Sequence, residues 1–181
     1  MVQGASGHFK KQVVYKQRGG KTYIAGMPTV DKKRERTLTE VKVTQRFVSA
    51  TAYAEAAMLD PVLKALYTKK VKPGQTARNV AFKDFQKKPS VLEIDTENYL
   101  GTVGSEIAVT ATDDCQVAGV TVRIFSAAGV LIEEGNATFN VHNNARWIYV
   151  ATQNTPALPG CKITATAKDL PGNKGTLDKV L

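Results

Sequence analysis

The second half of the chain alternates apolar and polar residues along several short segments. In segments 107–112 and 161–168, one of the two alternating sets of residues is apolar throughout. A period of two with one apolar face predicts half-buried β-strands. Similar runs, separated by turn-forming residues, occur at positions 91–95, 120–124, 131–132, 137–139 and 145–151. Short strands at this spacing predict an antiparallel β-sandwich over residues 91–181.

The first half of the chain begins with a predicted hairpin. Its two β-rich runs, 9–15 and 22–25, flank the pair Gly19-Gly20. Two glycines between such runs indicate a tight hairpin turn, because glycine adopts positive φ without a steric cost.

A first helix is predicted to begin after the hairpin, because Thr37 and Glu40 have the spacing of a capping box. Apolar residues then recur on one face of this helix, and we expect that face to be buried rather than to hold a cofactor. The residues of the face are Phe47, Ala50, Ala54 and Met58.

Two shorter helices are predicted to follow. Asp60 and Pro61 suit the N-cap and the first position of one helix, and Thr76 suits the N-cap of another. Residues 88–90 end this pattern, so we place a domain boundary after Ser90. The chain is therefore predicted to be α+β, with a hairpin and three-helix domain at 1–90 and a β-sandwich at 91–181.

The net charge of +9 is concentrated in the predicted helical domain. Residues 1–90 hold 19 Lys and Arg against 6 Asp and Glu, whereas residues 91–181 hold 6 against 10. A basic domain joined to an acidic one favours a polyanion such as nucleic acid as partner. The expected contact residues are Lys10, Lys16, Lys21, Lys32, Lys33, Arg34, Arg36, Lys42, Arg46, Lys83 and Lys87. For the lysines of the hairpin, the alternative is that they only protect a solvated edge strand.

Motifs for catalysis, metals or cofactors are not found in the sequence. His8 and His142 are the only histidines, and neither has a Cys, Asp or Glu at zinc-ligand spacing. Nucleophile-elbow, phosphate-loop and dinucleotide motifs are missing as well, so we predict neither an enzyme nor a cofactor. No secretion signal or apolar run of membrane-spanning length occurs, which favours a cytoplasmic protein without a membrane partner. A location in a virus particle or outside the cell by another route stays open.

The two cysteines are expected to be free thiols. Cys115 follows one predicted strand, and Cys161 begins another that runs back toward the same end. A strand of about eight residues, at roughly 3.3 Å each, would separate the two sulfurs by far more than a disulfide allows.

Two resemblances support this architecture. The pattern Ala111-Thr112-Asp113, answered by the segment Ala-x-Asp-x-Pro-Gly-Asn at residues 167–173, resembles bacterial immunoglobulin-like modules. The hairpin motifs at 13–15 and 20–23, the Asp-Pro helix and the motif at 77–81 resemble a family of small uncharacterised Bacteroidota proteins. That family resemblance implies an immunoglobulin-like C-terminal module and no assigned activity.

An immunoglobulin-like topology would bring four oxygen-bearing side chains to one end of the module. These are Asp113, Asp114, Asp169 and Asn173. They could hold Ca²⁺, but ordinary Asx turns are the favoured interpretation, because nothing enforces the six to eight ligands that calcium takes.

Two functions are compatible with these features. In the first, the chain is a non-catalytic binding protein whose basic domain engages nucleic acid or another polyanion, while the sandwich engages a protein partner. In the second, it is a structural or adhesive subunit of a larger assembly, such as a phage particle or an extracellular filament, and self-assembles through the sandwich.

Overall fold

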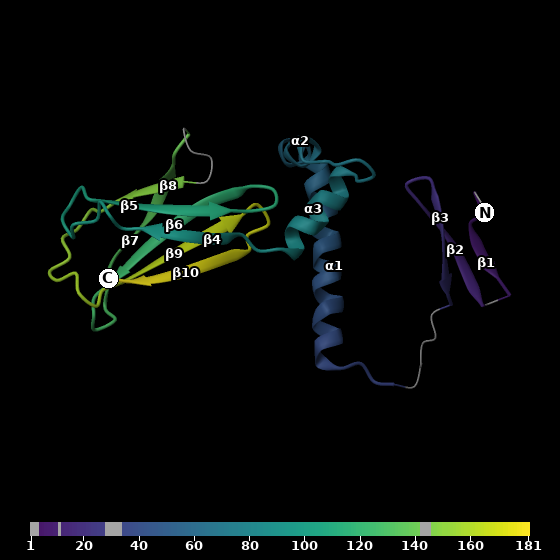
Figure 1. Ribbon diagram of the computed structural model, residues 1–181, viewed down its shortest axis with the longest axis horizontal. Helices are drawn as coiled ribbons and strands as arrows, with labels where there is room; N and C mark the ends of the chain where they lie inside the picture. The colour runs from purple at the N-terminus through teal and green to yellow at the C-terminus, as the bar shows by residue number, and fades with distance from the viewer. Residues whose placement is uncertain (1–3, 11, 28–33, 142–145) are drawn as a thin grey trace. The chain divides into compact units, whose positions relative to one another are not determined.

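The computed structural model describes residues 4–10, 12–27, 34–141 and 146–181 (Figure 1). Within these residues the chain is α+β, as predicted, with three helices and two antiparallel sheets of three and seven strands. The helices are α1 (Leu38–Leu59), α2 (Pro61–Lys69) and α3 (Ala77–Gln86). None of them, within the residues described, is long and apolar enough to span a bilayer.

The chain divides into two compact units, Met1–Gln45 and Arg46–Leu181. The division falls within α1, whereas the sequence placed a boundary after Ser90. The cause is an apolar cluster shared by the helices and the loops of the larger sheet. Ala54 of α1 and Tyr67 of α2 belong to this cluster together with Cys115, which follows a strand of the sheet.

The smaller sheet contains the predicted hairpin. Its strands, in the order β1-β2-β3, are β1 (Gly7–Phe9), β2 (Val13–Arg18) and β3 (Lys21–Gly26). Gly19 and Gly20 connect β2 to β3 with φ of 56° and 75°, so the prediction of a two-glycine hairpin turn is confirmed.

The predicted helix caps are also confirmed. The Thr37 backbone N–H donates to the Glu40 carboxylate at 2.9 Å, and the Glu40 N–H donates to Thr37 Oγ1 at 3.2 Å, which completes a capping box. Asp60 accepts from two N–H groups at the start of α2, and Thr76 accepts from Asn79 N–H at the start of α3.

The predicted buried face of α1 is only partly correct. Ala50 and Ala54 are fully buried, but Phe47 is 57% exposed. Its ring touches only the edge of the helical cluster, where it meets Phe82 of α3 at a centroid distance of 5.0 Å.

The larger sheet has the order β10-β9-β6-β7-β8-β5-β4 among the residues described. Its strands are β4 (Ser90–Asp95), β5 (Glu106–Thr112), β6 (Val117–Phe125), β7 (Leu131–Phe139), β8 (Arg146–Val150), β9 (Lys162–Asp169) and β10 (Lys174–Val180). The two edge strands approach each other, because Lys179 Nζ on β10 donates to the Ile94 carbonyl on β4 at 2.9 Å. The sheet therefore comes close to closing into a barrel.

Two strands differ from the prediction. Segments 131–132 and 137–139 were expected to be separate strands, but both belong to β7. Gly135 does not interrupt β7; its missing side chain makes room for the Tyr149 ring, which would lie 2.6 Å from a Cβ at this position. The final strand, β10, was not predicted.

The predicted inward positions of the sheet form its core. Ile107 and Val109 on β5, and Ile163 and Ala165 on β9, are fully buried. Both cysteines are free, as expected, and both are buried. They lie at opposite ends of the sheet, since Val117 pairs with Asp169 at one end of the β6–β9 ladder and the other end reaches Lys162, next to Cys161.

Candidate polyanion-binding surface

Cross-strand register divides the N-terminal sheet into two faces. Residues that pair across antiparallel strands share a face, and faces alternate along each strand. Lys16 pairs with Tyr23, and Arg18 pairs with Lys21, so these four side chains lie on one face, which we call the basic face. His8, Val14 and Ala25 complete it.

The opposite face, which we call the uncharged face, holds no charged residue. Its members are Phe9, Val13, Tyr15, Gln17, Thr22 and Ile24, together with Gly7 and Gly26. This separation follows from the alternation in the sequence, because each second residue of β2 and β3 turns to the same side.

The basic face concentrates positive charge that is not neutralised locally. No ion pair among the described residues includes Lys16, Arg18 or Lys21. Arg18 lies directly opposite Lys21, and like charges in such a pair repel each other. A bound anion would relieve this repulsion.

Tyr23 lies among these cations. It is opposite Lys16 across the ladder and two positions along β3 from Lys21, and it is 52% exposed. An exposed aromatic ring between cations is the arrangement on which single-stranded nucleic acids bind, with bases on the ring and phosphates on the cations.

The other predicted contact residues fall into distinct groups. Lys10 lies in the turn after β1, with its ammonium 5.6 Å from the centroid of the Phe9 ring. Lys32 and Lys33 lie outside the described residues. Arg34 forms an ion pair with Glu40, and this pair holds the pKa of the Glu40 carboxyl below its usual range.

The remaining predicted residues have mixed surroundings. Arg36, Lys42 and Lys83 are exposed. Arg46 donates from Nε to the Gln86 side chain at 3.1 Å and from Nη2 to the Gln86 carbonyl at 3.2 Å, so it caps the end of α3. Lys87 pairs with Asp114 at 2.5 Å, which raises the pKa of its ammonium.

The contact residues expected from the sequence do not include Arg18 or Tyr23 of the basic face. The hairpin turn at Gly19-Gly20 already fixes the pairs Arg18–Lys21 and Lys16–Tyr23, so the register was the signal that could have identified both.

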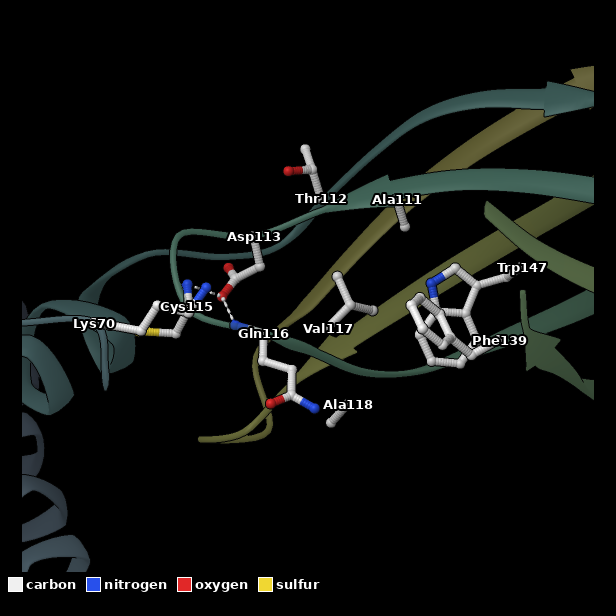
Figure 2. A pocket seen from close by; sticks show the side chains of 10 residues that line it. All are labelled: Lys70, Ala111, Thr112, Asp113, Cys115, Gln116, Val117, Ala118, Phe139 and Trp147. Atoms are coloured by element: carbon white, nitrogen blue, oxygen red, sulfur yellow. Dashed lines mark hydrogen bonds between the residues drawn. The ribbon is translucent and has the colours of Figure 1, made fainter. Parts of the chain in front are cut away.

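A groove of about 530 Å³ opens at one end of the larger sheet (Figure 2). Phe139 and Trp147 line one end of it, with ring centroids 5.1 Å apart, and Lys70 and Cys115 lie near the other. Burial and the nearby Asp84 raise the pKa of the Cys115 thiol to about 12, so this thiol stays protonated at neutral pH and is a poor nucleophile.

Next to Cys115 lies a chain of hydroxyl and carboxyl groups, in which Tyr67 and Asp84 are buried. Tyr53 and Tyr67 share a hydrogen bond of 2.7 Å between their hydroxyls, and Tyr67 donates to Asp84 Oδ2 at 2.7 Å. Burial raises the pKa of Asp84 to about 6, and the Asp113 carboxylate adds to this effect. Asp84 Oδ1 and Asp113 Oδ1 are both buried without a hydrogen-bond partner.

The four residues weighed for calcium take part in local turns and one ion pair instead. Asp113 accepts from the Cys115 and Gln116 N–H groups, and Asp169 accepts from Asn173 N–H at 2.6 Å. Among the residues that the structure describes, no group of three or more His, Cys, Asp or Glu side chains is placed to hold a metal ion.

Comparisons with known proteins give only distant structural similarity. No protein-family model matches the chain, and no curated protein matches it in sequence. A tetra-tandem repeat from the extending region of a large adhesion protein is 21% identical over 51% of this chain and 22% of its own, with a TM-score of 0.34. An engineered protein is 19% identical over 59% of this chain and 22% of its own, with a TM-score of 0.35.

A hypothetical protein from Pyrococcus horikoshii is similar over 51% of this chain and 84% of its own, at 11% identity and a TM-score of 0.31. These scores are too low to argue for a shared fold or function. The chain matches less than a quarter of the length of the adhesion-protein repeat and of the engineered protein.

Proposed function

We propose that the chain is a non-catalytic binding protein whose N-terminal sheet engages a polyanion through its basic face, with single-stranded nucleic acid as the preferred ligand. The observation that carries this proposal is the register that places exposed Tyr23 among Lys16, Arg18 and Lys21. The cations would contact phosphates, and the tyrosine ring would stack on a base irrespective of its identity.

Charge in the rest of the N-terminal unit supports the same ligand. Residues 1–45 hold ten Lys and Arg against three Asp and Glu, so the long-range field attracts polyanions. The larger sheet, from the acidic half of the chain, would serve a protein partner. We also propose that the larger sheet is arranged as in immunoglobulin-like modules, with β10, β9 and β6 in one half and β8, β5 and β4 in the other. The support for this is β7, which pairs with β6 and then with β8 and so joins the two halves.

The test measures binding of the full chain to fluorescent single-stranded DNA, duplex DNA and heparin over a salt series. The decisive variant is Lys16→Ala/Arg18→Ala/Lys21→Ala. If all three cations contact phosphates, the slope of log affinity against log salt for single-stranded DNA should become shallower by about 2.

A matched control carries the same change in net charge elsewhere. Lys64, Lys168 and Lys174 are exposed and lie outside the N-terminal unit, so their triple alanine variant should leave the salt slope nearly unchanged. Equal losses in the two triple variants would show that net charge alone governs binding, and the basic face would lose its role.

Tyr23 separates nucleic acid from other polyanions. Tyr23→Ala should weaken single-stranded DNA binding by about 1–3 kcal/mol, while Tyr23→Phe keeps the stacking surface and should bind like the parent chain. Heparin offers no bases, so its binding should hardly respond to Tyr23→Ala. Loss of heparin binding together with DNA binding would contradict stacking.

A structural subunit of a larger assembly is the second candidate function. It is favoured by large apolar side chains that α1 leaves exposed, including Leu38 at 81%, Val43 at 64% and Val48 at 61%. Covering such side chains with another protein would remove apolar surface from water. Ordered polymers of the purified chain in negative-stain electron microscopy would support this function, and a strictly soluble small species would oppose it.

A further inference from the structure

Two carboxylates meet where α3 packs against the turn between β5 and β6, and each has one oxygen without a partner. Asp84 Oδ1 and Asp113 Oδ1 are both buried, and neither has a hydrogen-bond partner within the residues that the structure describes. Their other oxygens are in use, because Asp84 Oδ2 accepts from the Tyr67 hydroxyl at 2.7 Å. Asp113 Oδ2 accepts from the backbone N–H groups of Cys115 and Gln116 at 2.9 and 3.2 Å. Each residue is therefore left with one buried acceptor that needs a donor.

We infer that Asp84 and Asp113 share one proton between their two Oδ1 atoms, and that this acid pair fastens α3 to the turn between β5 and β6. A protonated carboxyl donates one hydrogen bond and an ionised carboxylate accepts one, so a single proton taken from solvent provides both oxygens with a partner. The pair then carries one negative charge instead of two. Adjacent carboxylates keep a proton in this way because the first negative charge repels a second.

The contact between the two side chains supports this arrangement. Burial is the largest cause of the raised pKa of Asp84, and Asp113 raises it further through its charge and through a hydrogen bond between the two side chains. That hydrogen bond requires a proton, because two ionised carboxylates offer acceptors only. Both Oδ2 atoms already have donors, so the proton belongs between the Oδ1 atoms.

Other titratable groups face the acid pair from each element packed around it. They are Tyr53 on α1, Tyr67 on α2, Lys70 after α2, Lys87 after α3, Asp114 and Cys115 in the turn, and Asp169 at the end of β9. Lys87 is already paired with Asp114, and no ion pair among the described residues includes Asp84 or Asp113. Asp169 adds negative charge to the same region. A proton, and not a cation, therefore reduces the charge of the acid pair.

A shared proton makes the attachment of the turn to α3 depend on pH. The pKa of Asp84 is about 6 in the closed structure, against an ordinary value of 3.8. A carboxyl that leaves the pair and meets water returns to its ordinary range, so opening releases the proton between about pH 4 and pH 6. The raised pKa stabilises the closed form fully below about pH 4, and this stabilisation is lost as the pH rises through 6. The equilibrium constant for opening should thus rise about a hundredfold over this range and then level off.

The first measurement follows the carbon-13 signals of the side-chain carboxyl groups of the full chain by NMR, from about pH 3 to about pH 8. One proton shared by two residues should move the signals of Asp84 and Asp113 together, in one step near pH 6. The Asp114 signal is the internal control and should not take part in that step. A step near pH 6 for Asp84 alone would assign the proton to Asp84 only, and no step there would mean that both carboxylates are ionised. Either result overturns the inference.

Single substitutions then locate the proton. Asp113→Asn keeps an oxygen for the turn and removes the neighbouring charge, so the Asp84 step should move to clearly lower pH. Asp84→Asn should remove the response of Asp113 near pH 6. Asp114→Asn changes the net charge equally in the same turn and is the matched control, which should leave both signals as in the parent chain. If Asp113→Asn left the Asp84 step at pH 6, burial alone would hold the proton and the acid pair would be refuted.

Amide hydrogen exchange measures the attachment itself. The Cys115 and Gln116 N–H groups donate to Asp113, so their exchange, corrected for the intrinsic rate at each pH, reports how often the turn opens. Opening should increase about a hundredfold from about pH 4 to pH 7 in the parent chain and should not respond to pH in Asp84→Asn. The Val62 N–H at the start of α2 is the control and should not follow this increase. Equal opening at both pH values in the parent chain would contradict a pH-dependent attachment.

Discussion

Replacing Asp84 with asparagine should raise the free energy of unfolding at neutral and alkaline pH. Asp84 is only 1% exposed, and its Oδ1 is buried without a hydrogen-bond partner. The Tyr67 hydroxyl stabilises its charge, but burial and the neighbouring Asp113 carboxylate oppose it more strongly. Asparagine keeps an oxygen that accepts from Tyr67, and it adds an amide group that can donate toward Asp113.

The magnitude follows from the pKa of Asp84 in the folded chain, which is about 6 against an ordinary value of 3.8. A shift of about two units corresponds to about 3 kcal/mol. The folded pKa is raised, so the folded chain holds a proton that the unfolded chain releases between about pH 4 and pH 6. The stability contributed by this proton is fully present below pH 4 and is lost as the pH rises through 6.

Urea unfolding followed by circular dichroism at several pH values from 4 to 8 tests this reasoning. Asp84→Asn and the parent chain should be similarly stable at pH 4, and the variant should be more stable by about 3 kcal/mol at pH 8. Asp114→Asn is the control, since its exposed pair with Lys87 contributes little to stability and this variant should follow the parent chain at every pH. A stability difference that does not change with pH would refute a raised pKa for Asp84.

Three further predictions concern the same half of the chain. Asn173→Ala should lower the free energy of unfolding by about 2–3 kcal/mol, because the Asn173 amide lies within hydrogen-bonding distance of Asp169 Oδ2 and of the Phe85 and Lys87 carbonyls, at 2.8, 3.2 and 3.1 Å; an unchanged urea midpoint would contradict this. Gly175→Ala should cost about 3 kcal/mol, since a Cβ there would lie 1.9 Å from the Pro89 carbonyl oxygen, while Lys174→Ala beside it should be nearly neutral in the same assay. Millimolar calcium should leave the melting temperature unmoved, because Asp113 and Asp169 already accept hydrogen bonds from nearby backbone N–H groups; a clear rise would reopen a metal site.

Features that depend on neighbours in the sequence were predictable. The capping box of α1 needs only Thr37 and Glu40, and the N-cap of α2 needs only Asp60 with the residues that follow it. The hairpin turn at Gly19-Gly20 is equally local. Strand positions of β5 and β9 followed from alternation, because one side of each strand packs into the core.

Features that depend on distant residues were not predictable. Phe47 has the spacing of a buried residue, but it is exposed because α3 covers little of its ring, which contacts Phe82. Gly135 looks like a turn residue until the Tyr149 ring is placed against it. In the sequence, Asp84 resembles a solvent-exposed helix residue. Its pKa is raised because residues from other elements bury it and because the Asp113 carboxylate lies nearby. The basic face is set locally as well, because the turn at Gly19-Gly20 fixes its register.

The turn at the start of β10 shows why a cluster of acidic residues need not be a metal site. Asp169 accepts from the Asn173 backbone N–H at 2.6 Å and from its side-chain amide at 2.8 Å, so its oxygens are used within the turn. The same amide lies within hydrogen-bonding distance of the carbonyls of Phe85 and Lys87, where α3 ends. These carbonyls have no partner inside the helix and must find one elsewhere. The turn therefore fastens the end of α3 to the larger sheet, and this role accounts for Asp169 and Asn173 without a bound cation.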